Sequence, residues 1–147
     1  MKLSTRARYG TRALLDIALQ EGERPVLLRD VARRQGISLL YLEHIVAPLV
    51  IAGILRSTRG PKGGVWLIKN PTEIKLSTVI QLLEGSIGPV DCVDNPEVCS
   101  RSNVCVTRDL WDELKKAIEG TLGSITLQDL IEQQKKKEQP VSIMYYV

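Results

Sequence analysis

Aromatic residues are scarce in this sequence, and phenylalanine is absent. Only 4% of the 147 residues are aromatic, whereas 44% are hydrophobic. The core therefore has to be built mainly from leucine, isoleucine and valine. Histidine is almost absent too, because His44 is the only one. With one histidine, no recognisable nucleophile–base pair and no phosphate-cradling loop, we expect a protein that is not an enzyme.

Long apolar runs are also missing. No stretch approaches the roughly 18 apolar residues of a membrane span. The start, Met1-Lys2-Leu3-Ser4-Thr5-Arg6, has no apolar run and no small-residue cleavage site of the kind found in signal peptides. We therefore expect a cytoplasmic protein without a membrane partner. The length suits one domain, or one domain with an extension.

Charge is distributed unevenly along the chain, although the net charge is only +3. Residues 1–70 contain 12 Lys and Arg against 5 Asp and Glu, a net charge of +7. Residues 71–147 contain 8 against 12, a net charge of −4. A basic half favours a polyanion as its partner, although chance segregation of surface charge is the alternative.

The basic half has the order of a helix-turn-helix. Ser4 is placed to cap a helix that runs to about Gln20, and a second helix is predicted over residues 28–35. Gly36 suits the left-handed turn that ends the second helix, and Ser38 can cap the third. Pro48 is expected to end or kink that third helix, or to begin a short fourth one.

The third helix is the predicted recognition helix. Leu42, Ile45 and Val46 are expected to face the core, whereas the N-terminal residues of such a helix face the bases in the major groove. The predicted DNA-facing residues of this helix are Ser38, Leu39, Leu40, Tyr41, Glu43 and His44. Three of them have plainer readings. Tyr41 can be a half-buried packing residue, His44 an ordinary surface residue, and Glu43 can offset arginine charge as well as accept from cytosine.

A basic, glycine-rich hairpin follows at once. Residues 54–58 and 65–68 read as strands, with Arg59-Gly60-Pro61-Lys62-Gly63-Gly64 as the turn. Helix-turn-helix plus hairpin predicts a winged helix, with Arg59 and Lys62 reaching phosphates or the minor groove. Asn70-Pro71 marks a boundary, and Ser77 is expected to cap a helix that ends at Glu84 before Gly85.

The second half is predicted to be a loop followed by two helices. Residues 86–105 have little regular pattern. Apolar residues then recur at helical spacing, namely Leu110, Trp111, Leu114, Ala117, Ile118 and Leu122. Thr126 to Asp129 resembles a capping box that opens a last helix, and the residues from Gln139 are expected to be poorly ordered.

These motifs together resemble the winged-helix regulators that include the iron–sulfur cluster regulator IscR, the nitric-oxide-sensing repressor NsrR and the cysteine-metabolism repressor CymR. The likeness covers nearly the whole chain. It rests on four groups of residues: Met1 to Thr5 with Tyr9, Arg12-Ala13-Leu14 and Asp16; Gln35 to Ser38 with Tyr41-Leu42-Glu43; Gly53-Ile54-Leu55 with Arg59 to Gly64; and three cysteines before Trp111 and Ser124 to Leu127.

The resemblance implies a mainly α fold in four parts. Residues 1–85 would form the winged helix-turn-helix, 86–105 a cysteine-containing sensor loop, 106–138 the dimerisation helices and 139–147 a tail. Members are homodimers in which the long helix after the cysteine loop crosses to the partner subunit. The sensor loop lies beside the partner's DNA-binding domain. The partners implied are a second copy and double-stranded DNA, as an inverted repeat with half-sites roughly 34 Å apart.

The resemblance also assigns a role to Cys92, Cys99 and Cys105. In cluster-binding members, three cysteines of this loop hold an iron–sulfur cluster, and we prefer a [2Fe–2S] to a [4Fe–4S] cluster here. Members place a histidine three residues after the last cysteine, or an aspartate of the partner subunit at position 8. Arg108 and Arg8 occupy these two positions, and neither suits a ligand. The fourth ligand is left open between Asp91, Asp94, Glu97, Asp109, a group of the other subunit, a small thiol and water.

The cysteines by themselves allow several interpretations. Three thiolates from one loop suit an iron–sulfur cluster, which would be lost readily in air. Zinc usually takes four closed ligands, and no histidine is near. A reversible thiol switch or three inert cysteines would also be consistent with this pattern. The sequence therefore predicts a homodimeric DNA-binding regulator, of the repressor type, that senses iron, oxygen, nitric oxide or redox state through a cluster. The alternative is a regulator without a cluster, controlled by thiol redox chemistry or by a partner protein.

Overall fold

Helices dominate the computed structural model, which describes residues 2–20 and 22–139. The first helices and the hairpin are α1 (Thr5–Leu19), α2 (Leu28–Gln35), α3 (Leu39–Ile51), β1 (Leu55–Thr58) and β2 (Gly64–Leu67). They are followed by η1 (Pro71–Glu73), α4 (Leu76–Glu84), α5 (Asp91–Asp94), η2 (Pro96–Val98), α6 (Val106–Gly123) and α7 (Leu127–Glu138). The predicted class, a mainly α winged helix-turn-helix with a two-stranded wing, is confirmed.

The core lies between α1, α3 and α4 and consists almost entirely of aliphatic side chains. Leu14, Ile17, Leu42, Ile45 and Leu49 are fully buried there. Helix α1 packs against both α3 and α4, and a Cβ atom at position 10 would overlap Leu83 of α4. Glycine at this position therefore lets the two helices approach closely. An aliphatic core is what a sequence without phenylalanine requires.

The predicted helix-turn-helix is present with small differences. Ser4 caps α1, and its hydroxyl oxygen accepts from the Ala7 N–H at 3.1 Å. Pro48 was expected to end or kink the third helix, or to begin a fourth. Helix α3 instead continues through Pro48 to Ile51, so this proline neither ends the helix nor begins a new one. Because proline has no backbone N–H, the His44 carbonyl four residues earlier receives no helical hydrogen bond from Pro48. His44 is exposed, so water can reach this part of the helix.

The start of α4 differs from the prediction. Ser77 does not cap this helix, because Lys75 is at the N-cap and Leu76 is the first helical residue. Backbone pairing with a distant segment fixes this start. The Leu76 N–H donates to the Ile125 carbonyl at 2.9 Å, and the Leu127 N–H donates to the Ile74 carbonyl at 2.8 Å. A tertiary contact thus overrides the local capping signal.

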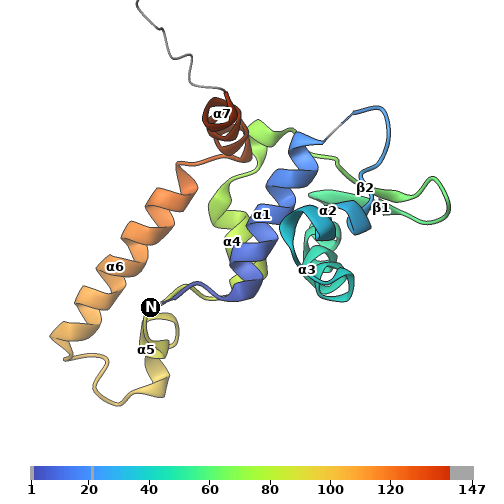
Figure 1. The fold of residues 1–147 in the computed structure, drawn as a ribbon. Helices are drawn as coiled ribbons and strands as arrows, with labels where there is room; N and C mark the ends of the chain where they lie inside the picture. Colours follow the sequence, from blue (N-terminus) through green and yellow to red (C-terminus); the bar gives the residue numbers. More distant parts are fainter. Residues whose placement is uncertain (1, 21, 140–147) are drawn as a thin grey trace, which may run out of the picture.

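The loop predicted over residues 86–105 is more ordered than its sequence indicates. It contains α5 and η2, and Val93 of α5 is buried. Figure 1 shows α5 near the first turn of α6, and α6 along the side of the molecule opposite to the wing. Within residues 2–20 and 22–139, no helix is both long enough and apolar enough to span a membrane. The disorder expected after Gln139 concerns residues 140–147, which lie outside the described residues.

Candidate nucleic-acid interface and cysteine segment

The predicted recognition helix presents the residues that were expected to face DNA. Ser38 caps α3, and its hydroxyl accepts from the Tyr41 N–H at 3.2 Å. Leu42, Ile45 and Val46 are buried, as expected. The exposed residues at the start of this helix are Ser38, Leu39, Leu40, Glu43 and His44. Leu40 keeps 68% of its surface exposed and the adjacent Leu39 keeps 40%, so the first turn of α3 presents apolar side chains beside its polar ones.

Tyr41 differs from the other predicted contacts, because it is half-buried. Its ring meets the ring of Tyr9 in α1 edge to face, with centroids 6.4 Å apart and an interplanar angle of 85°. This geometry is the favoured one for an aromatic pair. Tyr41 therefore has a packing role that links α3 to α1, which was the plainer reading of this residue.

A buried carboxylate holds the turn of the helix-turn-helix. Asp16 of α1 accepts from the Arg34 guanidinium at 2.6 Å and from the Gln35 side-chain amide at 2.7 Å. This carboxylate raises the pKa of Arg34. Gly36 then takes the left-handed conformation, with φ of 66°, that the turn needs. Asp16 thus fixes the angle between α1 and the start of the recognition helix.

The wing carries its cations at an exposed tip. Strand β1 pairs antiparallel with β2, from Leu55 opposite Leu67 to Thr58 opposite Gly64, and Arg59 and Lys62 are exposed beyond them. A Cβ atom at Gly63 would overlap the Thr58 carbonyl oxygen, so the turn requires glycine there.

The base of the wing is anchored to the segment before α2. The Val26 N–H donates to the Val65 carbonyl, and the Val65 N–H donates to the Val26 carbonyl, each at 2.8 Å. The sequence did not indicate this bridge, which is a single residue pair outside the two-stranded sheet. It fixes the wing relative to α2 and hence to the recognition helix that follows.

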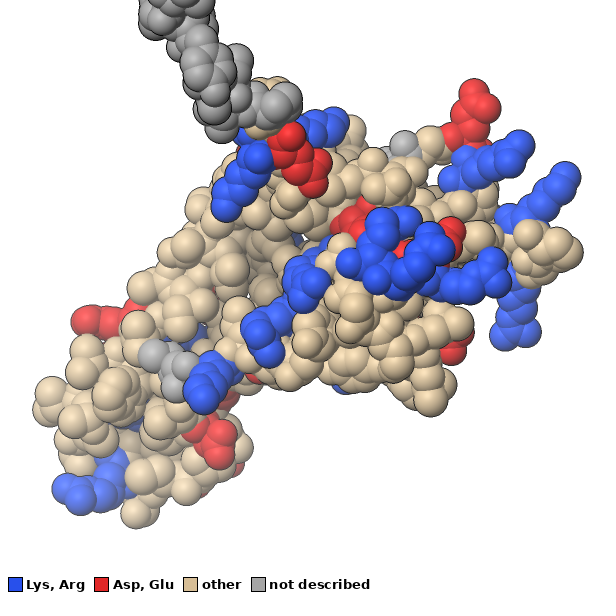
Figure 2. Space-filling model, in the orientation of Figure 1, with Lys and Arg blue, Asp and Glu red and all other residues tan. Residues whose placement is uncertain are grey.

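Positive charge gathers on the face of the molecule that carries α1, α2 and the wing (Figure 2). Figure 2 shows Lys and Arg side chains in a line over α1 and α2 and again around the wing. The arginines of α1 and α2 are all exposed and comprise Arg6, Arg8, Arg12, Arg29, Arg33 and Arg34. A helix that fits the major groove and is flanked by positive charge suits duplex DNA, because the charge can bind the phosphate backbone on either side of the groove.

The three cysteines lie on one segment, residues 91–105, which we call the cysteine segment. Cys92 belongs to α5, Cys99 follows η2, and Cys105 is the N-cap of α6. All three are free thiols and half-buried. The buried Ser102 hydroxyl donates within this segment, 2.7 Å from the Pro96 carbonyl and 2.9 Å from the Cys99 carbonyl. The pKa of the Cys105 thiol is lowered, mainly by its hydrogen bond with the Thr107 hydroxyl and to a smaller extent by the backbone of Arg108.

The chemistry of these donors fits an iron–sulfur cluster, but the segment does not gather them into a site. In the described part of the chain, no three His, Cys, Asp or Glu side chains are close enough together to hold one metal ion. Of the acidic candidates for a fourth ligand, Asp91, Glu97 and Asp109 are exposed, and Asp94 is held in an ion pair.

Helix α6 holds the cysteine segment through two side chains that are seven residues apart. The Arg108 Nε donates to the Cys92 carbonyl at 2.8 Å, and the Lys115 ammonium contacts the Asp94 carboxylate at 2.7 Å. Lys115, and then the Ser86 hydroxyl, lower the pKa of Asp94, and Asp94 in turn raises the pKa of Lys115. Sequence reasoning considered Arg108 only as an unsuitable ligand and did not consider Lys115.

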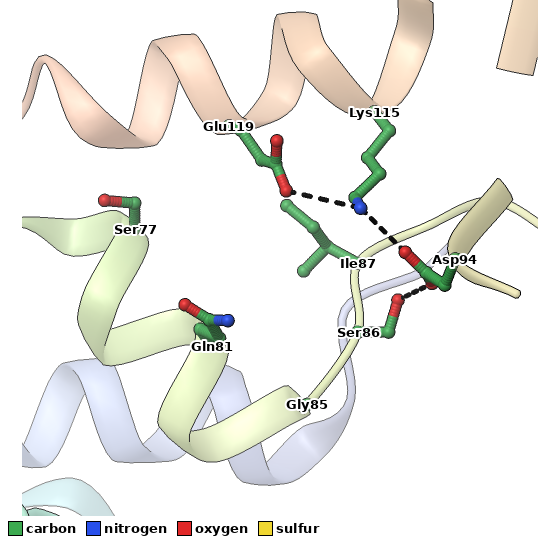
Figure 3. A pocket seen from close by; sticks show the side chains of 8 residues that line it. All are labelled: Ser77, Gln81, Gly85, Ser86, Ile87, Asp94, Lys115 and Glu119. Atoms are coloured by element: carbon green, nitrogen blue, oxygen red, sulfur yellow. Dashed lines mark hydrogen bonds and ion pairs between the residues drawn. The ribbon is translucent and has the colours of Figure 1, made fainter. Parts of the chain in front are cut away.

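A polar cavity of about 590 Å³ opens beside this ion pair. Figure 3 shows Lys115 and Glu119 on α6 facing Asp94 and Ser86, with Gln81 and Ser77 on α4 across the space. The segment from Gly85 to Ile87 forms its floor and leads from the end of α4 into the cysteine segment. The cavity thus lies where the winged helix, the cysteine segment and α6 meet.

A helix-turn-helix with an exposed recognition helix, a hairpin anchored beside it and a basic surface defines a winged-helix DNA-binding protein. The family model of Rrf2, described as iron-dependent transcriptional regulators, matches residues 3–133. The chain belongs to the Rrf2 family. It is accordingly a transcription regulator that binds DNA and not an enzyme.

Curated relatives agree with this assignment. The protein rrf2 of Nitratidesulfovibrio vulgaris is 45% identical over 131 residues, which cover 89% of this chain and 87% of the relative. The HTH-type transcriptional regulator IscR of Serratia proteamaculans is 40% identical over 134 residues, covering 91% and 81%.

Solved structures have the same architecture. The IscR of T. potens superposes with a TM-score of 0.80 at 38% identity, covering 99% of this chain and 97% of that one. CymR, the global cysteine regulator of B. subtilis, superposes with a TM-score of 0.74 at 34% identity, covering 90% and 98%. The resemblance stated from the sequence motifs is therefore confirmed.

Proposed function

We propose that this protein is a homodimeric regulator that senses iron, oxygen, nitric oxide or redox state through an iron–sulfur cluster bound by Cys92, Cys99 and Cys105. The observation that carries the proposal is the set of three free thiols on one segment held by α6. Thiolates are the usual protein ligands of such clusters. Family membership supports it, since the family model describes iron-dependent regulators. We also propose that the protein acts in the cytoplasm, where a regulator of this family would meet its DNA.

The DNA contacts belong to the same proposal. Ser38, Leu40, Glu43 and His44 of α3 would face base edges, and Arg59 and Lys62 of the wing would contact phosphates or the minor groove. Tyr41 would contribute by its hydroxyl edge while its ring packs on Tyr9. The division into a winged helix (1–85), a sensor loop (86–105), dimerisation helices (106–138) and a tail (139–147) is part of this proposal.

The dimer would form through α6, a helix with no buried residue in the single chain. Leu110 keeps 54% of its surface exposed, and Ala117, Ile118, Thr121 and Leu122 line an open apolar hollow. An 18-residue helix with no fully buried side chain has apolar surface left for a partner, and a second copy in antiparallel or crossed contact would cover it. Two recognition helices related by a two-fold axis would then read an inverted repeat.

When bound, a cluster supplies iron that responds to oxidants, small ligands and iron supply. The chain's own residues would carry that response to DNA. Asp94 contacts Ser86, next to the end of α4, and Glu84 of α4 accepts from the Ser4 N–H at 3.1 Å at the start of α1. A coupling of about 1–3 kcal/mol between the cysteine segment and the DNA-binding surface is enough to change affinity 5- to 150-fold.

The test is the cofactor content of protein prepared without oxygen. We expect iron and acid-labile sulfide together with a visible chromophore, which Cys92→Ala, Cys99→Ala and Cys105→Ala each abolish while the helical circular dichroism spectrum is retained. Ser100→Ala, on the same exposed turn, serves as the matched control and should keep the chromophore. Each cysteine variant should also have an altered affinity for operator DNA. Stoichiometric zinc without sulfide, or protein free of metal that forms a reversible disulfide, would contradict the cluster proposal.

A further inference from the structure

The exposed face of α3 carries little charge for a surface that meets DNA. Between Leu39 and Ile51 the helix has no lysine or arginine. Its exposed residues are Leu39, Leu40, Glu43, His44, Ala47 and Ile51. The commonest base-specific contact, from arginine or lysine to guanine, therefore cannot come from this helix. Base identity has to be read by contacts of another kind.

Leu40 is the apolar residue of this face that lies best for such a contact. It belongs to the first turn of α3, which Ser38 caps, and it keeps 68% of its surface exposed. Residues three and four apart are neighbours on a helix, so Leu40 shares its face with Glu43 and His44. The N-terminal residues of a recognition helix are those that meet base edges. An apolar side chain is thus presented where the bases are read.

The major groove offers an apolar side chain one favourable partner. Its floor is lined by hydrogen-bonding atoms of the bases, and the C5 methyl of thymine is the apolar group among them. Leucine against this methyl removes apolar surface from water on both sides of the contact. Leucine against a polar base atom displaces water and returns no hydrogen bond. Attraction to the methyl and rejection of polar edges act in the same direction, so a leucine here discriminates between base pairs.

We infer that Leu40 selects a pyrimidine with a C5 methyl group, which in unmodified DNA is thymine, at one position of each half-site. The inference rests on the proposed reading of DNA by α3 and names the base that its first turn recognises. 5-Methylcytosine has its methyl at the same place and would satisfy Leu40 as well. An apolar protein surface is the competing partner of Leu40. Membership of a DNA-binding family and the basic side chains over α1, α2 and the wing (Figure 2) favour DNA.

The experiment replaces thymine by uracil, which removes the C5 methyl and keeps every hydrogen-bonding atom. Full-length wild-type protein first selects a duplex from a random-sequence library, and each thymine of one selected half-site is then replaced in turn. We expect uracil at one position to weaken wild-type binding about threefold to tenfold, because one methyl group stays in water. A C·G pair at this position should weaken binding further, and 5-methylcytosine in place of that cytosine should recover part of the loss.

Protein variants connect this sensitivity to Leu40. Leu40→Ala should bind the thymine duplex about threefold to tenfold more weakly and should no longer distinguish uracil from thymine at that position. Leu40→Met, which keeps an apolar side chain, should retain the distinction. Ile51→Ala is the matched control, because Ile51 is an 87% exposed apolar residue at the other end of the same helix. It should bind and discriminate as wild type, and all three variants should unfold at the wild-type temperature.

Several outcomes would overturn the inference. One is a selected half-site that contains no thymine, or in which no thymine is sensitive to uracil. Another is a Leu40→Ala variant that keeps the wild-type distinction. A third is a Leu40→Ala variant with unchanged DNA affinity and a changed mass by light scattering, which would place Leu40 against a protein surface. Failure of the wild-type protein to select any duplex would instead contradict the proposed reading of DNA by α3.

Discussion

A single carboxylate illustrates how much one residue organises in this fold. Asp16 is buried, and Arg34 and Gln35 both bind it across the gap between α1 and α2. Without this carboxylate, the guanidinium and the amide would each lose a charge-assisted partner at the turn that precedes the recognition helix. Such hydrogen bonds to charged groups contribute more than neutral ones.

We therefore expect Asp16→Asn to lower the free energy of unfolding by about 1–3 kcal/mol, because it removes the charge that Arg34 and Gln35 share. Urea denaturation measures the change. The control is Asp30→Asn, which breaks the exposed pair with Arg33 at 3.3 Å and should cost less than about 1 kcal/mol. Equal effects of the two variants would show that Asp16 does not organise the turn.

At the scale of elements, the wing and the cysteine segment are each positioned by contacts outside themselves. Val26 pairs with β2 of the wing, and α6 holds α5 through Arg108 and Lys115. Each element therefore has a fixed position relative to α2 or α6, and substitutions of its exposed residues test function with little effect on the core.

For the wing, Arg59→Ala should weaken DNA binding. If Arg59 contacts only phosphate, the loss is similar on all sequences and the salt slope falls by about one for each contact removed. If it enters the minor groove, the loss depends on the sequence. Fluorescence anisotropy on selected and scrambled duplexes distinguishes the two. Lys135→Ala, in the last turn of α7, is the control for a change of charge alone. Unchanged affinity of the Arg59 variant would exclude a role of the wing tip.

For the cysteine segment, Lys115→Met should release α5 from α6. Hydrogen exchange of the amides of residues 91–95 should accelerate, whereas Lys116→Met should leave it unchanged, because Lys116 pairs with Asp112 within α6 at 2.6 Å. Unaltered exchange in the Lys115 variant would mean that the ion pair does not hold the segment.

The same ion pair has a defined dependence on pH. The pKa of Asp94 is lowered, so its contribution is complete above the ordinary aspartate pKa of about 3.9 and is lost only as the pH falls through the lower folded value. We expect the contact to be insensitive to pH between about 5 and 8. An NMR titration of the Asp94 carboxyl should give a midpoint below the ordinary value, and this midpoint should rise toward it in Lys115→Met.

At the scale of the whole molecule, α6 is the element that a single chain leaves incomplete. None of its 18 residues is buried, although its apolar residues recur at helical spacing. It packs on α4 and α5 along part of its surface only. Its remaining apolar surface is the predicted dimer interface.

We expect the protein to be a dimer at micromolar concentration by light scattering. Ile118→Glu should weaken dimerisation by about 100-fold or more, because it places an unpaired charge in an apolar contact. Glu113→Gln, an exposed change on the same helix, should leave the mass unchanged. A monomeric wild-type protein would contradict the assignment of α6 to an interface.

Much of the architecture followed from local sequence signals. Ser4 and Ser38 cap the helices predicted for them, Gly36 forms the turn, and Thr126 and Asp129 form the capping box. These features depend on residues within a few positions of one another, so a single sequence can reveal them. The motifs from Met1 to Ser124 also led to the correct family.

Other features were decided by contacts between distant segments. The start of α4 depends on pairing with residues 125–127, and the wing depends on Val26. Arg108 and Lys115 hold the cysteine segment against α6, and the aromatic contact of Tyr9 with Tyr41 joins α1 to the recognition helix. The sequence by itself determined the helices, the turns and the three thiols, because their signals are local or compositional. Only the tertiary structure decided which of these lie together, because such contacts join residues far apart in the chain and leave no periodic pattern in it.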